Sequence, residues 1–70
     1  MRFIIIKTIE GNVEAVNPKM ISNLAMFDDP RGTYVGLFMN GGHLIRTQFT
    51  NIDNAIDYIQ RAPSVSLGEA

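Results

Sequence analysis

The amino-acid sequence predicts an α+β fold, in which a small antiparallel sheet of four to five strands, built from β-hairpins, is followed by one C-terminal amphipathic helix. Segments rich in β-branched and aromatic residues occur in pairs, with turn-forming residues between the members of each pair. A later segment repeats apolar residues at helical spacing. We expect residues 1–62 to form a single domain and residues 63–70 a C-terminal tail.

The chain is short for an independently stable domain. A domain of this length buries only about 60% of its unfolded surface. The sequence has 0 Cys and one His, which removes disulfides and a structural zinc site as sources of stability. Hydrophobic residues nevertheless make up 46% of the chain. The composition therefore predicts stabilisation by close packing, by a partner or by self-association.

The first hairpin is expected at the N-terminus. Residues 2–9 are rich in β-branched residues, residues 10–12 form a Glu-Gly-Asn turn cluster, and residues 13–16 provide the second strand. Asn17 and Pro18 then end the pairing, because proline has no backbone N–H and restricts the residue before it.

The next segment, residues 19–27, is compatible with two structures. Its apolar residues fit helical spacing, but they also alternate as in a strand. We favour one helical turn over residues 18–21 that runs into a short strand.

A second hairpin is expected after the turn-forming residues 28–32. Residues 33–39 and 43–49 are strand-like, and the Asn-Gly-Gly sequence of residues 40–42 suits a hairpin turn because these residues readily adopt left-handed conformations. A phosphate-binding loop normally leads into the N-terminus of a helix. Since this loop leads into a strand, we interpret it as a turn and not as a ligand cradle.

The C-terminal helix is indicated by an apolar stripe. Its members are Ile52, Ala55, Ile56 and Ile59. Thr50 precedes Asp53 by three residues and resembles the start of a capping box. Arg61 complements the helix dipole in the last turn, and Pro63 ends the helix.

Both faces of the predicted sheet carry apolar side chains, whereas one short helix can cover only one face. Leaving four large apolar side chains exposed would forgo roughly 6 to 12 kcal/mol. The second face is therefore expected to close on itself as a barrel, to meet a second copy or to bind a partner protein, and self-association needs only one patch. The candidate interface residues are Phe3, Ile5, Tyr34, Phe38 and Met39.

The charge balance disfavours nucleic-acid binding. Six basic and seven acidic residues give a net charge of -1 without a block of like charge. The N-terminal apolar run is far too short for a signal peptide or a membrane span. A cytoplasmic protein without membrane attachment and without a cofactor is expected.

Residues that could support catalysis are sparse. His43 is the only candidate general base, and no cysteine or well-placed serine accompanies it, so no catalytic residue is assigned. Asp28 and Asp29 are typical of a turn, and Asp53 and Asp57 of a solvated helix face, so no metal site is assigned either. We predict that the protein is not an enzyme.

Arginine and glutamine residues provide a candidate ligand site. Arg46 and Gln48 alternate on one face of the last strand, and the planar guanidinium group suits carboxylates and phosphates. The alternative is that Arg46 pairs with a carboxylate on a neighbouring strand. The candidate ligand-binding residues are Arg31, Gly32, Asn40, His43, Arg46 and Gln48.

The segments VNPKMISNL, DDPRG, TYVGLFMNGGHLIRT and NIDNAIDYI occur in an order that resembles the small flagellar FlbD/SwrD-like family, over about residues 8–60. The shared features are Asn17, Pro18, Gly41 and alternating apolar positions. The resemblance implies a non-enzymatic accessory or regulatory protein and transfers no catalytic residue. A looser similarity exists to LytTR-type DNA-binding β domains, which are longer and more basic.

The sequence thus predicts a non-enzymatic binding or regulatory module that forms a homo-oligomer and acts through a protein or small anionic ligand. One alternative is an inhibitor encoded by a phage or a mobile element that sequesters a host protein or a nucleotide signal. Others are a nucleic-acid-binding regulator and an enzyme that uses His43.

Overall fold

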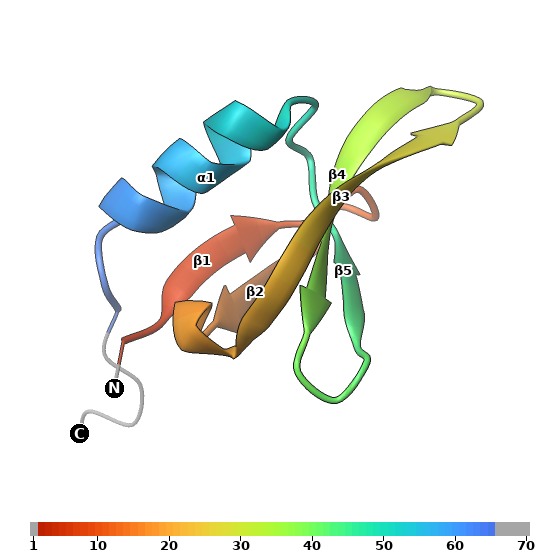
Figure 1. Ribbon diagram of the computed structural model, residues 1–70. Coiled ribbons are helices and arrows are strands. Elements are labelled where there is room, and N and C mark those ends of the chain that lie inside the picture. The colour runs from red at the N-terminus through yellow and green to blue at the C-terminus, as the bar shows by residue number, and fades with distance from the viewer. Residues whose placement is uncertain (1, 66–70) are drawn as a thin grey trace.

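The computed structural model describes residues 2–65 and confirms an α+β fold with antiparallel sheets and a C-terminal helix (Figure 1). Its elements in chain order are β1 (Ile4–Lys7), β2 (Val13–Val16), the 3-10 helix η1 (Pro18–Met20), β3 (Ile21–Asp29), β4 (Gly32–Met39), β5 (Leu44–Arg46) and α1 (Ile52–Arg61). The expectation of a single sheet of four to five strands is wrong. The strands form one sheet of two, β1 and β2, and one of three in the order β3-β4-β5.

The two sheets meet at one isolated bridge between Thr8 and Thr47. On either side of it, the Ile9 N–H donates to the Arg46 carbonyl at 3.0 Å and the Gln48 N–H donates to the Lys7 carbonyl at 3.1 Å. Beyond this bridge the described chain keeps its contact with β4, because the Thr47 N–H donates to the Val35 carbonyl at 3.0 Å and the Phe49 carbonyl accepts from the Val35 N–H at 2.8 Å. The β1-β2 and β3-β4-β5 sheets are therefore joined at this point without forming one continuous sheet.

The segment after Pro18 follows the favoured interpretation at its start. The side chain of Asn17 accepts a hydrogen bond from the Lys19 N–H at 3.0 Å and caps η1, which runs directly into β3. β3 is not short, however, since it extends over nine residues. Its register against β4 runs from Leu24 opposite Leu37 to Asp29 opposite Gly32, with an irregularity between Ile21 and Asn23.

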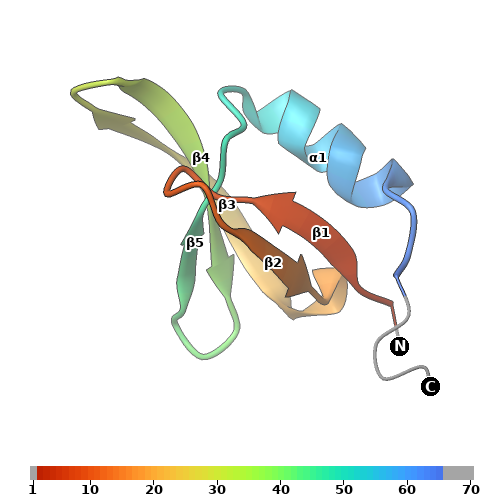
Figure 2. The same ribbon diagram turned by 180° about the vertical axis from the view of Figure 1, so that it is seen from behind.

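The turn between β3 and β4 is tighter than the five residues expected. Asp29 pairs with Gly32, so only Pro30 and Arg31 lie between the strands. The Asp29 side chain accepts a hydrogen bond from the Arg31 N–H at 2.7 Å, which stabilises the turn. The end of this hairpin, called the arm below (residues 27–34), projects beyond the rest of the fold in both views (Figure 2).

The Asn-Gly-Gly segment is a hairpin turn between β4 and β5, as expected. Gly41 and Gly42 have φ values of 95° and 94°, which L-residues with side chains rarely adopt. The turn is closed by the His43 carbonyl, which accepts from the Met39 N–H at 2.8 Å. β5 then ends at Arg46, three residues earlier than predicted.

The core lies between the sheets and α1, and its buried apolar residues are Ile4, Ile6, Val16, Val35, Leu37, Ile45, Ala55 and Ala62. The predicted helix stripe is correct at Ile52, Ala55 and Ile59 but wrong at Ile56, which is 39% exposed. Tyr58 packs against the core in its place.

The N-cap of α1 also differs from the prediction. Asn51, and not Thr50, caps the helix, because its side-chain oxygen accepts from the Asn54 N–H at 3.1 Å. At the other end, Arg61 forms an exposed ion pair with Asp57 at 2.8 Å.

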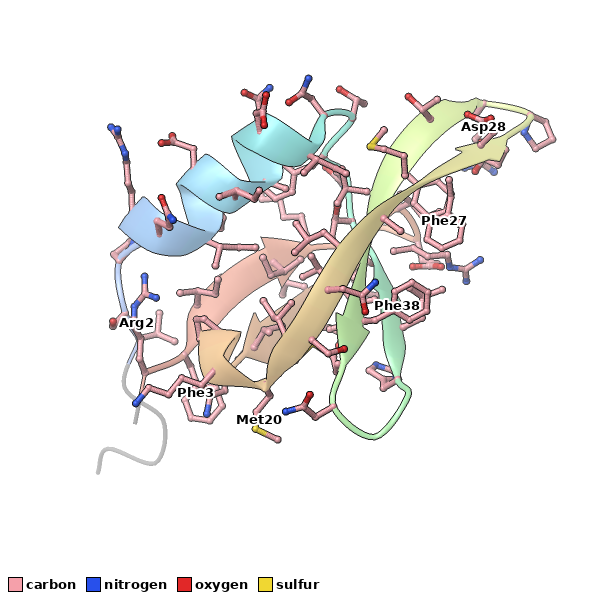
Figure 3. The ribbon with its side chains drawn as sticks, in the orientation of Figure 1. Arg2, Phe3, Met20, Phe27, Asp28 and Phe38 are labelled. Atoms are coloured by element: carbon pink, nitrogen blue, oxygen red, sulfur yellow. The ribbon has the colours of Figure 1, made fainter. Side chains whose placement is uncertain are left out.

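Arg2 joins the N-terminus to the end of α1. Its guanidinium group donates to the carbonyls of Ile59 at 3.0 Å and Ala62 at 2.9 Å, which lie at the C-terminal end of the helix (Figure 3). Next to it, the Val65 N–H donates to the Phe3 carbonyl at 2.9 Å. The first residues of the predicted tail are therefore attached to the domain, and residues 66–70 lie outside the described residues.

Replacing Arg2 by methionine should lower the free energy of unfolding by about 1 to 2 kcal/mol, since two helix carbonyls lose a charged donor while the aliphatic length is kept. Urea unfolding measures the change. Lys19→Met is the control, because Lys19 is exposed on η1 and should change stability very little. Equal stability of both variants would show that the Arg2 contacts do not hold in solution.

Candidate functional site

An aromatic cluster lies on the side of the β3-β4-β5 sheet that is turned away from α1 (Figure 3). It consists of Phe27, Tyr34 and Phe38, and we call it the aromatic face. The ring centroid of Phe27 lies 5.5 Å from that of Tyr34 and 5.9 Å from that of Phe38. All three side chains are half-buried, so each ring leaves part of its surface accessible.

Gly36 provides space on the sheet for the Phe27 ring. It is a buried residue of β4, and a Cβ atom at this position would lie 2.6 Å from the Phe27 ring and 2.9 Å from the Leu44 side chain. The missing side chain therefore creates the space that Phe27 occupies. A glycine between Tyr34 and Phe38 was the signal in the sequence for this arrangement.

The five predicted interface residues do not share one surface. Tyr34 and Phe38 belong to the aromatic face, whereas Met39 packs against the core on the opposite side of β4. Phe3 and Ile5 are half-buried and come from the β1 segment, outside the three-stranded sheet. Of the five residues, only Tyr34 and Phe38 of β4 lie in one cluster, where the Phe27 ring contacts both.

Three hollows that share lining residues follow one another from β1 to the arm, and together we call them the groove. The first, of about 360 Å³, is lined by Ile5, Lys7, Gln48, Phe49 and Tyr58. The second, of about 260 Å³, shares Gln48 with the first and continues over Ile9 and Tyr34 to Arg31. The third, of about 640 Å³, lies between the arm and the β1-β2 turn and includes both Arg31 and Arg46.

Four of the six predicted ligand-binding residues line this groove, namely Arg31, Gly32, Arg46 and Gln48. The other two, Asn40 and His43, lie at the opposite end of β4. His43 Nε2 is 3.9 Å from Glu14 Oε1 at the surface, in a contact that is ionic only when the imidazole is protonated. The sequence prediction therefore combined residues from two separate places.

The charges in the third hollow are nearly balanced. Arg46 forms an ion pair with Glu10, so it does meet a carboxylate, but Glu10 lies in the β1-β2 turn and not on a neighbouring strand as the alternative expected. The Asp29 carboxylate is next to Arg31 and accepts its backbone N–H. Arg31 itself is exposed, and its guanidinium group has no ion pair within residues 2–65.

Of the side chains that line the first hollow, sequence reasoning named Gln48 as ligand-binding and Ile5 as an interface residue, and it missed Lys7, Phe49 and Tyr58. Tyr58 donates its hydroxyl hydrogen to the Ile5 carbonyl at 2.6 Å, and its ring lies 5.4 Å from that of Phe49 between centroids. The signal was the helical spacing, because Tyr58 follows Ala55 by three residues and so shares its inward face.

Within the described residues, no group of three or more His, Cys, Asp or Glu side chains could hold a metal ion. The same part of the chain contains no helix of the length and apolarity that a membrane crossing requires.

Comparison of the chain with protein-family models, with curated proteins and with solved structures finds no match.

Proposed function

We propose that this protein is a non-enzymatic binding module that associates with a second copy of itself through the aromatic face. The observation that supports the proposal is the position of Phe27, Tyr34 and Phe38 on the side of the sheet opposite to α1. The helix α1, together with the β1-β2 sheet, packs against the other side. The three rings are only half-buried within the described residues.

Burial of these rings between two copies would be favourable, since a fully buried large apolar side chain contributes about 1.5 to 3 kcal/mol. In a symmetric dimer the same patch serves both subunits, so each ring is counted twice. Aromatic side chains also concentrate the energy of interfaces into a few contacts. A homodimer that buries Phe27, Tyr34 and Phe38 is the simplest assembly that covers this face.

Sedimentation velocity over a range of protein concentrations tests the proposal. We expect the wild-type chain to associate and Phe38→Ser to raise the dissociation constant at least about tenfold, as expected for the loss of one buried aromatic contact. Ile56→Ser is the matched control, because it removes an exposed apolar residue from α1 and should leave association unchanged. A wild-type chain that stays monomeric at every concentration would contradict the proposal.

The aromatic face would also suit a different partner protein. That alternative corresponds to the inhibitor and accessory roles considered from the sequence. A nucleic-acid role has less support, since Glu10 and Asp29 flank the two arginines of the third hollow. Binding to DNA that weakened steeply as salt rises would favour that role over self-association. We place the module in the cytoplasm as part of the same proposal.

A further inference from the structure

The first hollow of the groove is built from segments that are far apart in the sequence. Ile5 and Lys7 come from β1, Gln48 and Phe49 from the segment after β5, and Tyr58 from α1. Its volume of about 360 Å³ lies within the range of roughly 300 to 1,000 Å³ that is typical of small-molecule sites.

Hydrogen bonds hold the walls of this hollow in place. The Tyr58 hydroxyl is bound to the Ile5 carbonyl at 2.6 Å, and Gln48 Nε2 donates to the Thr8 carbonyl at 2.9 Å. The Phe49 N–H donates to Thr47 Oγ1 at 3.1 Å. Because these contacts restrict the side chains and backbone that line the hollow, little further ordering should be needed for binding.

The chemistry of the walls is specific. The rings of Phe49 and Tyr58 and the side chain of Ile5 offer an apolar surface for a flat ring. Lys7 lines the same hollow and is exposed, and within residues 2–65 its ammonium group has no ion pair. The first hollow thus combines an apolar wall with the Lys7 ammonium group, which suits a ligand that is both aromatic and anionic.

We propose that the first hollow binds a small ligand that carries a flat aromatic ring and an anionic group, with the ring against Phe49 and Tyr58 and the anion beside Lys7. The neighbouring second hollow shares Gln48 with the first and is lined by Arg31. A nucleotide is one member of this class. The inference rests on the binding part of the proposed function and does not depend on self-association.

Amide NMR spectra recorded during titration test the site with two aromatic anions, adenosine monophosphate and indoleacetate. We expect at least one of them to shift the amides of Lys7, Gln48 and Phe49. Adenosine and inorganic phosphate serve as controls, and each should bind at least about tenfold more weakly than the complete ligand, since each offers only one of the two contacts. No shift with either aromatic anion would overturn the proposal.

The Lys7→Gln variant should weaken binding of the responding anion about tenfold, whereas Lys7→Arg should keep most of it. Lys19→Gln is the matched control and should bind like the wild type, because Lys19 lies on η1 outside the groove. Equal weakening by the two glutamine variants would overturn the assignment of the anion to Lys7.

Sedimentation of Lys7→Gln separates this inference from the proposed self-association. We expect this variant to associate like the wild type while it loses ligand affinity. If the amide NMR signals around the hollow instead shift with protein concentration and do not change with either anion, a second copy occupies the hollow and the ligand proposal is wrong.

Discussion

Replacing Leu37 by alanine should lower the free energy of unfolding by about 3 to 4 kcal/mol. Leu37 is 0% exposed, lies in the middle of β4 and pairs with Leu24 and Ile45 on its two sides. Removing its side chain loses transfer free energy and leaves a cavity between the sheet and α1. Because small domains have only about 5 to 15 kcal/mol of total stability, this single change should remove a large fraction of it.

Urea unfolding followed by circular dichroism measures this change. Ile56→Ala is the matched control, because it removes a similar apolar side chain that is 39% exposed and should cost less than about 1 kcal/mol. If both variants lost the same stability, Leu37 would not be buried as the structure describes.

Replacing Thr47 by valine should cost about 2 kcal/mol although the two side chains have nearly the same shape. Thr47 is 0% exposed, its hydroxyl donates to the Val35 carbonyl at 2.7 Å, and its oxygen accepts from the Phe49 N–H at 3.1 Å. Valine cannot make either bond, and the Phe49 N–H loses its partner at the point where the chain leaves β1.

The same unfolding assay applies, and Thr33→Val is the control because Thr33 is exposed in β4 and should tolerate the change. Amide hydrogen exchange adds a local measurement. In the Thr47 variant the Phe49 and Gln48 amides should exchange faster than in the control, since both lie beside the bridge that joins the two sheets. Unchanged exchange with unchanged stability would show that the hydroxyl contributes nothing.

Local patterns predicted most of the secondary structure. The β1-β2 and β4-β5 hairpins follow from alternating apolar residues around glycine-containing turns, and the break at Pro18 follows from the missing N–H. The candidate site was predicted only in part. Arg31 and Arg46 do lie in one groove, but their proximity depends on how the arm meets the β1-β2 turn.

The sequence by itself determined the strands, the turns and the helix, because these depend on side-chain periodicity and backbone preferences within a few residues. Tertiary structure decided how they combine. The β1-β2 and β3-β4-β5 sheets meet only at the bridge between Thr8 and Thr47 within the described residues, in place of one continuous sheet, and the core selects Tyr58 over Ile56 for the inner face of α1. These outcomes are settled by contacts between residues that are distant in the chain, which patterns within a few residues do not encode.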